Sequence, residues 1–159
     1  MSRITPFLWF DDQAEEAANF YTSVFPDSEI LDVARYGEGG PGEPGSAMTV
    51  RFALSGEEFV ALNGGPEHYG FNLGVSFVVG CSTSEEVDHY WSKLTEGGAE
   101  SNCGWLVDRY GLSWQIVPDE LPAVLGDPDP QRAQRAMQAM LGMKKLDIAA
   151  MKRAADGLT

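Results

Sequence analysis

The stretch EEAANFYTSVF at residues 15–25 has a counterpart 70 positions later, EEVDHYWSKLT at residues 85–95. The apolar residues of the first stretch recur at intervals of three and four, at Ala17, Phe20, Tyr21 and Val24. This spacing puts them in one stripe along a helix, of the kind that packs on a sheet. The two stretches therefore predict two equivalent helices, one in each half of an internal repeat.

The residues at the beginning of each stretch match the sequence signature of a helix N-terminus. Asp12 stands three positions before Glu15, and Ser82 stands three positions before Glu85. In such a capping box the first side chain accepts a hydrogen bond from an otherwise unpaired amide, and the glutamate reaches back to the cap residue. We therefore expect Asp12 and Ser82 to cap the two helices.

Strand-like segments flank both helices in the same order. FLWF precedes the first helix at residues 7–10, and FVVG precedes the second at residues 77–80. The segments that follow are residues 29–36, 48–54 and 58–62 in the first half, and 100–108 and 112–117 in the second. This order predicts an α+β fold of two tandem βαβββ modules, about residues 1–66 and 70–120, whose sheets curl around a cavity. The modules pair either within one chain or across a dimer.

The glycine-rich segment GEGGPGEPG, at residues 37–45, has the composition of a phosphate-binding loop. Such a loop needs a strand before it and a helix start after it. This segment joins two strand-like stretches instead. It predicts a long hairpin and no nucleotide site.

Charge is distributed unevenly along the chain. Residues 1–130 hold 22 of the 24 acidic and 5 of the 11 basic residues, whereas residues 131–159 hold 2 acidic and 6 basic residues. An acidic body repels phosphate backbones, so no nucleic-acid partner is expected. The basic tail is either complementary to an acidic body, its own or a partner subunit's, or a solvated helix face.

The composition also argues against a membrane or secreted protein. The longest apolar runs, such as residues 75–79, are far shorter than the about 20 residues that span a membrane. The N-terminus has no signal-peptide layout. Cys81 and Cys103 are too few for a disulfide framework and lack metal-site spacing. We expect a cytoplasmic protein with no membrane contact.

The tail, residues 131–159, predicts a helical arm that follows a body formed by residues 1–130. Helices are expected at residues 131–141 and 146–155, on either side of Gly142. Four of the six methionines lie in this tail and give it an adaptable apolar surface. The arm packs against the body or across a homodimer, or it forms a helix pair that binds a target.

Four phrases of the sequence resemble the PhnB-like branch of the vicinal-oxygen-chelate superfamily, which includes glyoxalase I and the bleomycin- and fosfomycin-resistance proteins. They are ITPFLWFDDQAEEAANFY at residues 4–21, ALNGGP at 61–66, CGWLVDRYGLSWQIVP at 103–118 and AMQAMLGMKKLDIAAMKRA at 136–154. The resemblance implies a fold of two βαβββ modules, which agrees with the repeat. Members are often labelled 3-demethylubiquinone-9 3-methyltransferase.

Enzymes of this superfamily hold a divalent metal with His, Gln or Glu side chains that point into the cavity. The resemblance places the ligand positions near Ile4 and Pro6, at Val60, near Gly74 and Ser76, and at Gln115. Only Gln115 has suitable chemistry, and one neutral amide does not hold a hard cation. His68 and His89 match no ligand position. We expect no metal and no other cofactor.

Strand alternation selects the side chains that could line a pocket. It puts Ser113, Gln115 and Val117 on one face of the last strand, and Leu112, Trp114 and Ile116 on the other. In the fosfomycin-resistance relatives, substrate-contacting side chains lie three and five residues before the Asp of a turn. The matching turn is DRYG at residues 108–111, so the resemblance implies Trp105 and Cys103. The same alternation adds Pro6, Leu8, Leu62 and Ser76 as lining candidates.

These residues favour a binding pocket for a small, fairly apolar molecule. Cys103 is a lining thiol or a nucleophile, and no His is evidently placed to activate it. Trp105 stacks on a flat or cationic ligand or simply packs in the cavity wall. The leading hypothesis is a homodimeric PhnB-like protein that binds or transforms a small molecule without the usual metal. The alternatives are a metal-dependent glyoxalase- or dioxygenase-type enzyme and, with less support, the methyltransferase of the family label.

Overall fold

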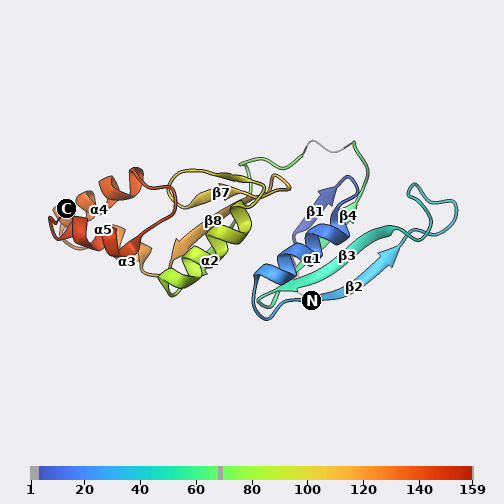
Figure 1. The fold of residues 1–159 in the computed structure, drawn as a ribbon, viewed down its shortest axis with the longest axis horizontal. Coiled ribbons are helices and arrows are strands. Elements are labelled where there is room, and N and C mark those ends of the chain that lie inside the picture. The colour runs from blue at the N-terminus through green and yellow to red at the C-terminus, as the bar shows by residue number, and fades with distance from the viewer. Residues whose placement is uncertain (1–3, 68–69, 159) are drawn as a thin grey trace. The chain divides into compact units, whose positions relative to one another are not determined.

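The computed structural model describes residues 4–67 and 70–158, and its contacts divide the chain into two compact units, Met1–Gly70 and Phe71–Thr159. The first unit contains β1 (Phe7–Phe10), α1 (Ala14–Val24), β2 (Glu29–Arg35), β3 (Ala47–Leu54) and β4 (Glu57–Asn63). Its four strands form one sheet in the order β1-β4-β3-β2. β1 runs parallel to β4, and the other neighbours are antiparallel (Figure 1).

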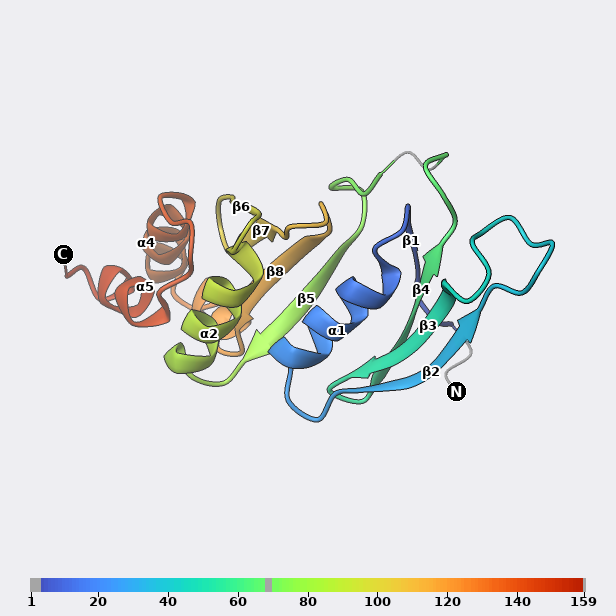
Figure 2. The ribbon, with the colours of Figure 1, turned by 45° about the vertical axis from the view of Figure 1, so that its right-hand side comes forward.

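The second unit repeats this topology. It contains β5 (Ser76–Cys81), α2 (Ser84–Thr95), β6 (Ala99–Glu100), β7 (Trp105–Val107) and β8 (Ser113–Pro118). The strand order is β5-β8-β7-β6, and β5 runs parallel to β8 at one edge of the sheet (Figure 2). The predicted α+β fold with two βαβββ modules is confirmed. The predicted hairpin at residues 37–45 joins β2 to β3, and Tyr36 and Ser46 are bonded through their backbones at its base.

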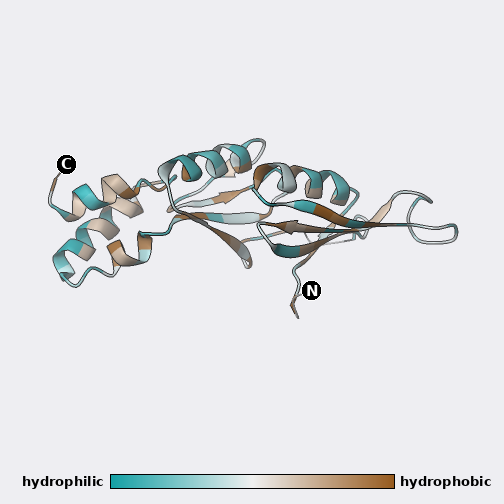
Figure 3. Ribbon diagram, turned by 90° about the horizontal axis from the view of Figure 1, so that it is seen from below, coloured by the Kyte–Doolittle hydropathy of each residue, from teal (hydrophilic) through white to brown (hydrophobic). Residues whose placement is uncertain are grey.

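Each helix covers one face of its own sheet (Figure 3). In the first unit the buried Tyr21 of α1 stacks on Phe52 of β3, which in turn stacks on Phe59 of β4. In the second unit Leu94 of α2 and Ile116 of β8 are fully buried. The apolar stripe of the first helix therefore forms a core with the sheet, as its spacing predicts.

The helix caps differ from the prediction. α1 begins after Gln13, which makes no side-chain capping bond, and the first amide, Ala14 N, donates instead to Asn63 Oδ1 at 2.8 Å. α2 is capped by Thr83, one residue later than expected, while Ser82 N donates to Glu86 Oε2. The prediction for Asp12 is wrong because a tertiary contact supplies the cap. The prediction for Ser82 is wrong by one position, because the cap of α2 is Thr83.

The C-terminal arm packs on the second unit. It contains α4 (Pro130–Leu141) and α5 (Ile148–Ala155), and a short helix that was not expected, α3 (Leu121–Leu125), precedes it. Ala136 of α4 and Met151 and Ala155 of α5 form a buried cluster. Cys103 N and Gly104 N donate to the carbonyls of Met143 and Lys144, so the arm is bonded to the β6–β7 turn. Within the described residues no helix is long and apolar enough to span a membrane.

Candidate functional site

The face of the second sheet that α2 does not cover carries three of the seven predicted pocket residues, Ser76, Trp105 and Gln115. We call it the open face. Its residues, given by strand register, are Ser76, Val78, Gly80, Ala99, Trp105, Val107, Ser113, Gln115 and Val117. The alternation predicted for β8 agrees with this arrangement, since Trp114 and Ile116 are buried with Leu106 on the covered face.

Ser76, Gln115 and Trp105 lie together on the open face. Gln115 Nε2 donates a hydrogen bond to Ser76 Oγ at 3.0 Å. In register, Gln115 has Trp105 of β7 on one side and Val78 of β5 on the other. Val78 is 60% exposed. A neutral hydrogen-bonding pair thus stands between an aromatic ring and an exposed aliphatic side chain.

Ser113 adds a hydroxyl that the protein leaves unpaired. It lies directly opposite Ser76 in register and has no exposed surface. Its Oγ has no hydrogen-bond partner in the part of the chain that the structure describes. An unsatisfied buried hydroxyl costs about 1–3 kcal/mol. Folding alone does not explain such a group, because an alanine would fit the same position without that cost.

The open face contains no charged residue among the nine that form it. The whole chain has a net charge of −13. The corresponding face of the first sheet differs, because it carries the ion pair between Arg51 and Glu58. The absence of charge is therefore a local property of the open face.

The open face does not fit a divalent metal. Ser76 and Gln115 are two of the positions that the predicted resemblance marks for metal ligands, and here they bond to each other as neutral groups. The described residues contain no group of three or more His, Cys, Asp or Glu side chains that could hold a metal ion. His89 lies on α2, with its ring edge-on to Tyr90. His68 lies outside the described residues.

Three other lining candidates lie in the first unit. Leu8 is buried on the face that α1 covers, opposite Ala61, whereas Leu62 pairs with Trp9 on the other face. Leu8 and Leu62 therefore cannot line the same side of the sheet. Pro6 precedes β1, and its carbonyl accepts from Val60 N.

The misplacement of Leu8 has a specific cause. Three residues connect β1 to α1, but two connect β5 to α2. The offset of 70 residues that aligns the two helices is therefore wrong by one residue for the strands that precede them. Because successive side chains of a strand point to opposite faces, this error of one residue assigns each side chain of β1 to the wrong face. The residues equivalent to Val78 and Gly80 are Phe7 and Trp9, which are 58% and 41% exposed.

Cys103, which the family resemblance selected, lies outside the strands of the second sheet. Its φ is +59°, in the turn between β6 and β7, so the strand pattern does not extend to it. Its thiol contacts the carbonyl of Met140 at 3.6 Å. The structure thus places Cys103 against the arm.

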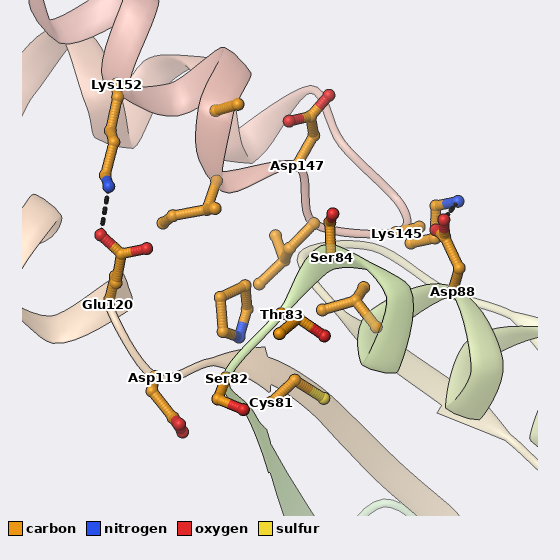
Figure 4. Close-up of a pocket in the computed structure, with 15 residues that line it drawn as sticks. Cys81, Ser82, Thr83, Ser84, Asp88, Asp119, Glu120, Lys145, Asp147 and Lys152 are labelled. Carbon is orange, nitrogen blue, oxygen red and sulfur yellow. Dashed lines mark hydrogen bonds and ion pairs between the residues drawn. The ribbon is translucent and has the colours of Figure 1, made fainter.

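A separate cavity of about 580 Å³ lies between the start of α2, the ends of β5 and β8, and the arm (Figure 4). Ion pairs join Lys145 to Asp88 and Lys152 to Glu120 among its lining residues. Cys81 also lines it; burial raises the pKa of this thiol to about 12, and the charges of Glu86 and Asp119 add to the effect. Sequence reasoning missed this cavity because the arm that closes it gave no signal of where it docks.

The fold is that of the vicinal-oxygen-chelate superfamily. A family model described as 3-demethylubiquinone-9 3-methyltransferase matches residues 2–117, so the chain belongs to this family, the PhnB-like branch of the superfamily. The predicted resemblance is confirmed. The arm lies beyond the matched residues. The comparison with curated proteins finds no match.

Solved structures agree with this assignment. A Bacillus cereus structure described as a 3-demethylubiquinone-9 3-methyltransferase, PhnB protein, is 41% identical, with 74% of this chain and 99% of that chain covered and a TM-score of 0.69. A Pseudomonas aeruginosa protein is 20% identical, covers 74% and 98%, and has a TM-score of 0.62. The fosfomycin resistance protein FosX of Listeria monocytogenes is 13% identical, covers 76% and 93%, and has a TM-score of 0.54. The last two show the fold alone.

Proposed function

We propose that this protein binds a small molecule on the open face of its second sheet and contacts it directly through Ser76, Gln115 and Trp105. The observation that carries the proposal is the hydrogen bond between Gln115 and Ser76 beside Trp105. The pair occupies positions at which the superfamily uses a metal to hold substrate oxygens. Neutral amide and hydroxyl groups can bind such oxygens themselves.

Methyl transfer, which the family description names, has no support in the elements of this chain. A nucleoside cofactor is commonly held by a glycine-rich turn between a strand and a helix. The turns from β1 to α1 and from β5 to α2 contain no glycine, and residues 37–45 join two strands. We therefore expect no change in thermal stability when S-adenosylmethionine is added.

The same proposal includes a cytoplasmic homodimer. Phe7 and Trp9 are exposed on the uncovered face of the first sheet, and a second copy would bury these aromatic rings. Both cysteines are free thiols, which is in keeping with a reducing compartment. Sedimentation of the wild type and of Phe7→Arg tests the dimer, since a charge in that interface would yield monomers.

Metal titration tests whether Ser76 and Gln115 contact the ligand themselves or hold a metal that does so. Purified wild-type protein is dialysed against Mn²⁺, Ni²⁺ or Zn²⁺, and bound metal is measured for it, for Gln115→Ala and for the rebuilt pair Ser76→His with Gln115→Glu. We expect saturable binding only in the rebuilt pair, because it supplies an imidazole and a carboxylate in place of a hydroxyl and an amide. One equivalent of metal in the wild type that is lost in Gln115→Ala would overturn the proposal. Gln138→Ala, an exposed change on α4, serves as the control.

A further inference from the structure

We infer that the C-terminal arm positions Trp105 on the open face by holding the turn between β6 and β7, so that docking of the arm regulates the ligand site. The inference rests on the proposed function, in which Trp105 contacts the ligand, and adds how that contact is regulated. It follows from the backbone bonds and conformation of the turn and from the burial of Leu146 against it.

Gly104 joins the arm to β8 through its own backbone. Its amide donates to the carbonyl of Lys144 in the arm at 2.7 Å, and its carbonyl accepts from Ile116 N of β8 at 2.8 Å. Trp105 follows Gly104 in the chain, and Gln115 precedes Ile116. A single residue therefore connects the arm to the chain neighbours of two proposed ligand contacts.

The conformation of this turn depends on support from outside it. Cys103 and Gly104 have φ angles of +59° and +84°, in the left-handed region that residues other than glycine rarely adopt. A cysteine keeps such a conformation where surrounding contacts fix it. The arm supplies these contacts, since Cys103 N donates to the Met143 carbonyl at 2.8 Å, beside the bond made by Gly104 N. Without the arm, two amides of the turn lose their acceptors.

Leu146 is the apolar contact that keeps the arm on the turn. It is 3% exposed, and a Cβ added to Gly104 would come within 2.9 Å of its side chain and of the Ile116 carbonyl. The glycine therefore lets the arm and β8 approach the turn closely at the same point. The ion pair between Lys144 and Glu100 adds little, because its atoms are 3.9 Å apart and both side chains are at least 47% exposed.

Docking of the arm and binding of a ligand are coupled through Trp105. When the arm is docked, the turn is fixed and Trp105 is held opposite Gln115 in the β7–β8 ladder. When the arm is undocked, the residue before Trp105 loses its bond to the arm and the turn is free to relax. A ligand that contacts Trp105 therefore binds the docked form more tightly, and by linkage it stabilises the docked arm.

Amide hydrogen exchange of the ¹⁵N-labelled full chain, followed by NMR without ligand, tests this coupling. The arm amides, Cys103 N and Gly104 N, report whether the arm is docked, because their acceptors lie in it. The turn amides, Trp105 N and Ile116 N, report whether the turn and its bond to β8 are intact. The reference amide, Leu112 N, donates to a buried carboxylate in the turn between β7 and β8 and reports opening of the whole sheet.

We expect the turn amides to share the protection of the arm amides and to be less protected than the reference amide. Leu146→Ala should lower the protection of the arm and turn amides together by about tenfold or more, because it weakens docking. Leu146→Met, which keeps the side-chain volume, should retain wild-type protection. Leu141→Ala is the matched control, because Leu141 lies in the same arm and is 62% exposed, and it should change none of these amides.

Three results would overturn the inference. If the turn amides shared the protection of the reference amide while the arm amides exchanged faster, the arm would undock without releasing Trp105. If the turn amides exchanged faster than the arm amides, the turn would open without the arm. If all five amides were equally protected, the arm would open only when the whole unit unfolds and would not regulate the site.

These comparisons can be made in the wild type alone, so they decide the matter even where Leu146→Ala fails to fold. They contain no ligand and no metal, and their outcome is therefore independent of the proposed function. One equivalent of metal that is lost in Gln115→Ala would overturn the proposed function and leave the exchange pattern unchanged.

Discussion

Asp108 and Trp114 are bonded side chain to side chain across the turn that leads into β8, with Trp114 Nε1 donating to Asp108 Oδ2 at 2.8 Å. The other oxygen of Asp108 accepts from the amides of Tyr110 and Leu112 at 2.8 and 3.1 Å. Asp108 is only 2% exposed. One buried carboxylate therefore fixes the turn, and Gln115, next in the chain after Trp114, depends on it for its place on the open face.

Replacing Asp108 with alanine should lower the free energy of unfolding by roughly 2–4 kcal/mol, because three donors lose a buried acceptor. Urea unfolding followed by tryptophan fluorescence measures the change. Asp32→Ala is the matched control, since Asp32 is exposed on β2, and it should change stability by about 0.5 kcal/mol or less. Equal effects of the two substitutions would show that the Asp108 bonds contribute little.

The repeat and the strand faces could be predicted from sequence because they depend on local periodicity. Spacing alone placed the helices, alternation selected Ser76 and Gln115, and the family resemblance added Trp105. The cap of α1 could not be predicted, since Asn63 lies 49 residues away from the amide that it binds. Leu8 was assigned to the wrong face of its strand, because aligning the two halves at one constant offset hides the extra residue between β1 and α1. The arm's docking site likewise depends on tertiary contacts that leave no periodic signal.

The cap of α1 provides a direct comparison of local and tertiary signals. Asn63 accepts from Ala14 N and also donates to the Ala47 carbonyl at 3.0 Å. Asn63→Ala should therefore cost about 1–2 kcal/mol of stability, whereas Asp12→Ala, at the position that the sequence marks as the cap, should cost a few tenths at most. Urea unfolding of both variants decides between them. A larger loss of stability in Asp12→Ala than in Asn63→Ala would show that Asp12 caps the helix, as the capping-box signature predicts.

Cys81 should make stability sensitive to alkaline pH. Burial raises its pKa from an ordinary value of 9.0 to about 12, with Glu86 and Asp119 adding to the effect. The folded chain therefore holds the thiol proton more tightly than the unfolded chain does. This contribution is complete below about pH 9 and is lost as the pH rises toward about 12.

The comparison with Cys81→Ala isolates this contribution, because all other titrating groups are shared. The difference in unfolding free energy between wild type and variant should be largest near neutral pH and should shrink above pH 9.0. A difference that is constant across this range would show that the thiol ionises as readily in the folded state. The native thiol of Cys81 should also resist iodoacetamide, since only the thiolate reacts.

The arm should be held to the second unit by apolar contact and backbone bonds and only weakly by its charges. Leu146 is 3% exposed, and its side chain lies so close to Gly104 that a Cβ added there would come within 2.9 Å of it. By contrast, Lys145 and Lys152 pair with Asp88 and Glu120 through side chains that are between 44% and 62% exposed. Exposed pairs of this kind contribute about 1 kcal/mol or less, and salt screens them.

Leu146→Ala should therefore lower the free energy of unfolding of the second unit by roughly 2–5 kcal/mol, whereas Lys145→Gln and Lys152→Gln should each change it by about 1 kcal/mol or less. Leu141→Ala is the matched control, because Leu141 belongs to the same arm but is 62% exposed. Urea unfolding at low and high salt measures all four variants. If the lysine variants lost more stability than Leu146→Ala, and if high salt removed the difference, the basic charge of the tail would be what docks it.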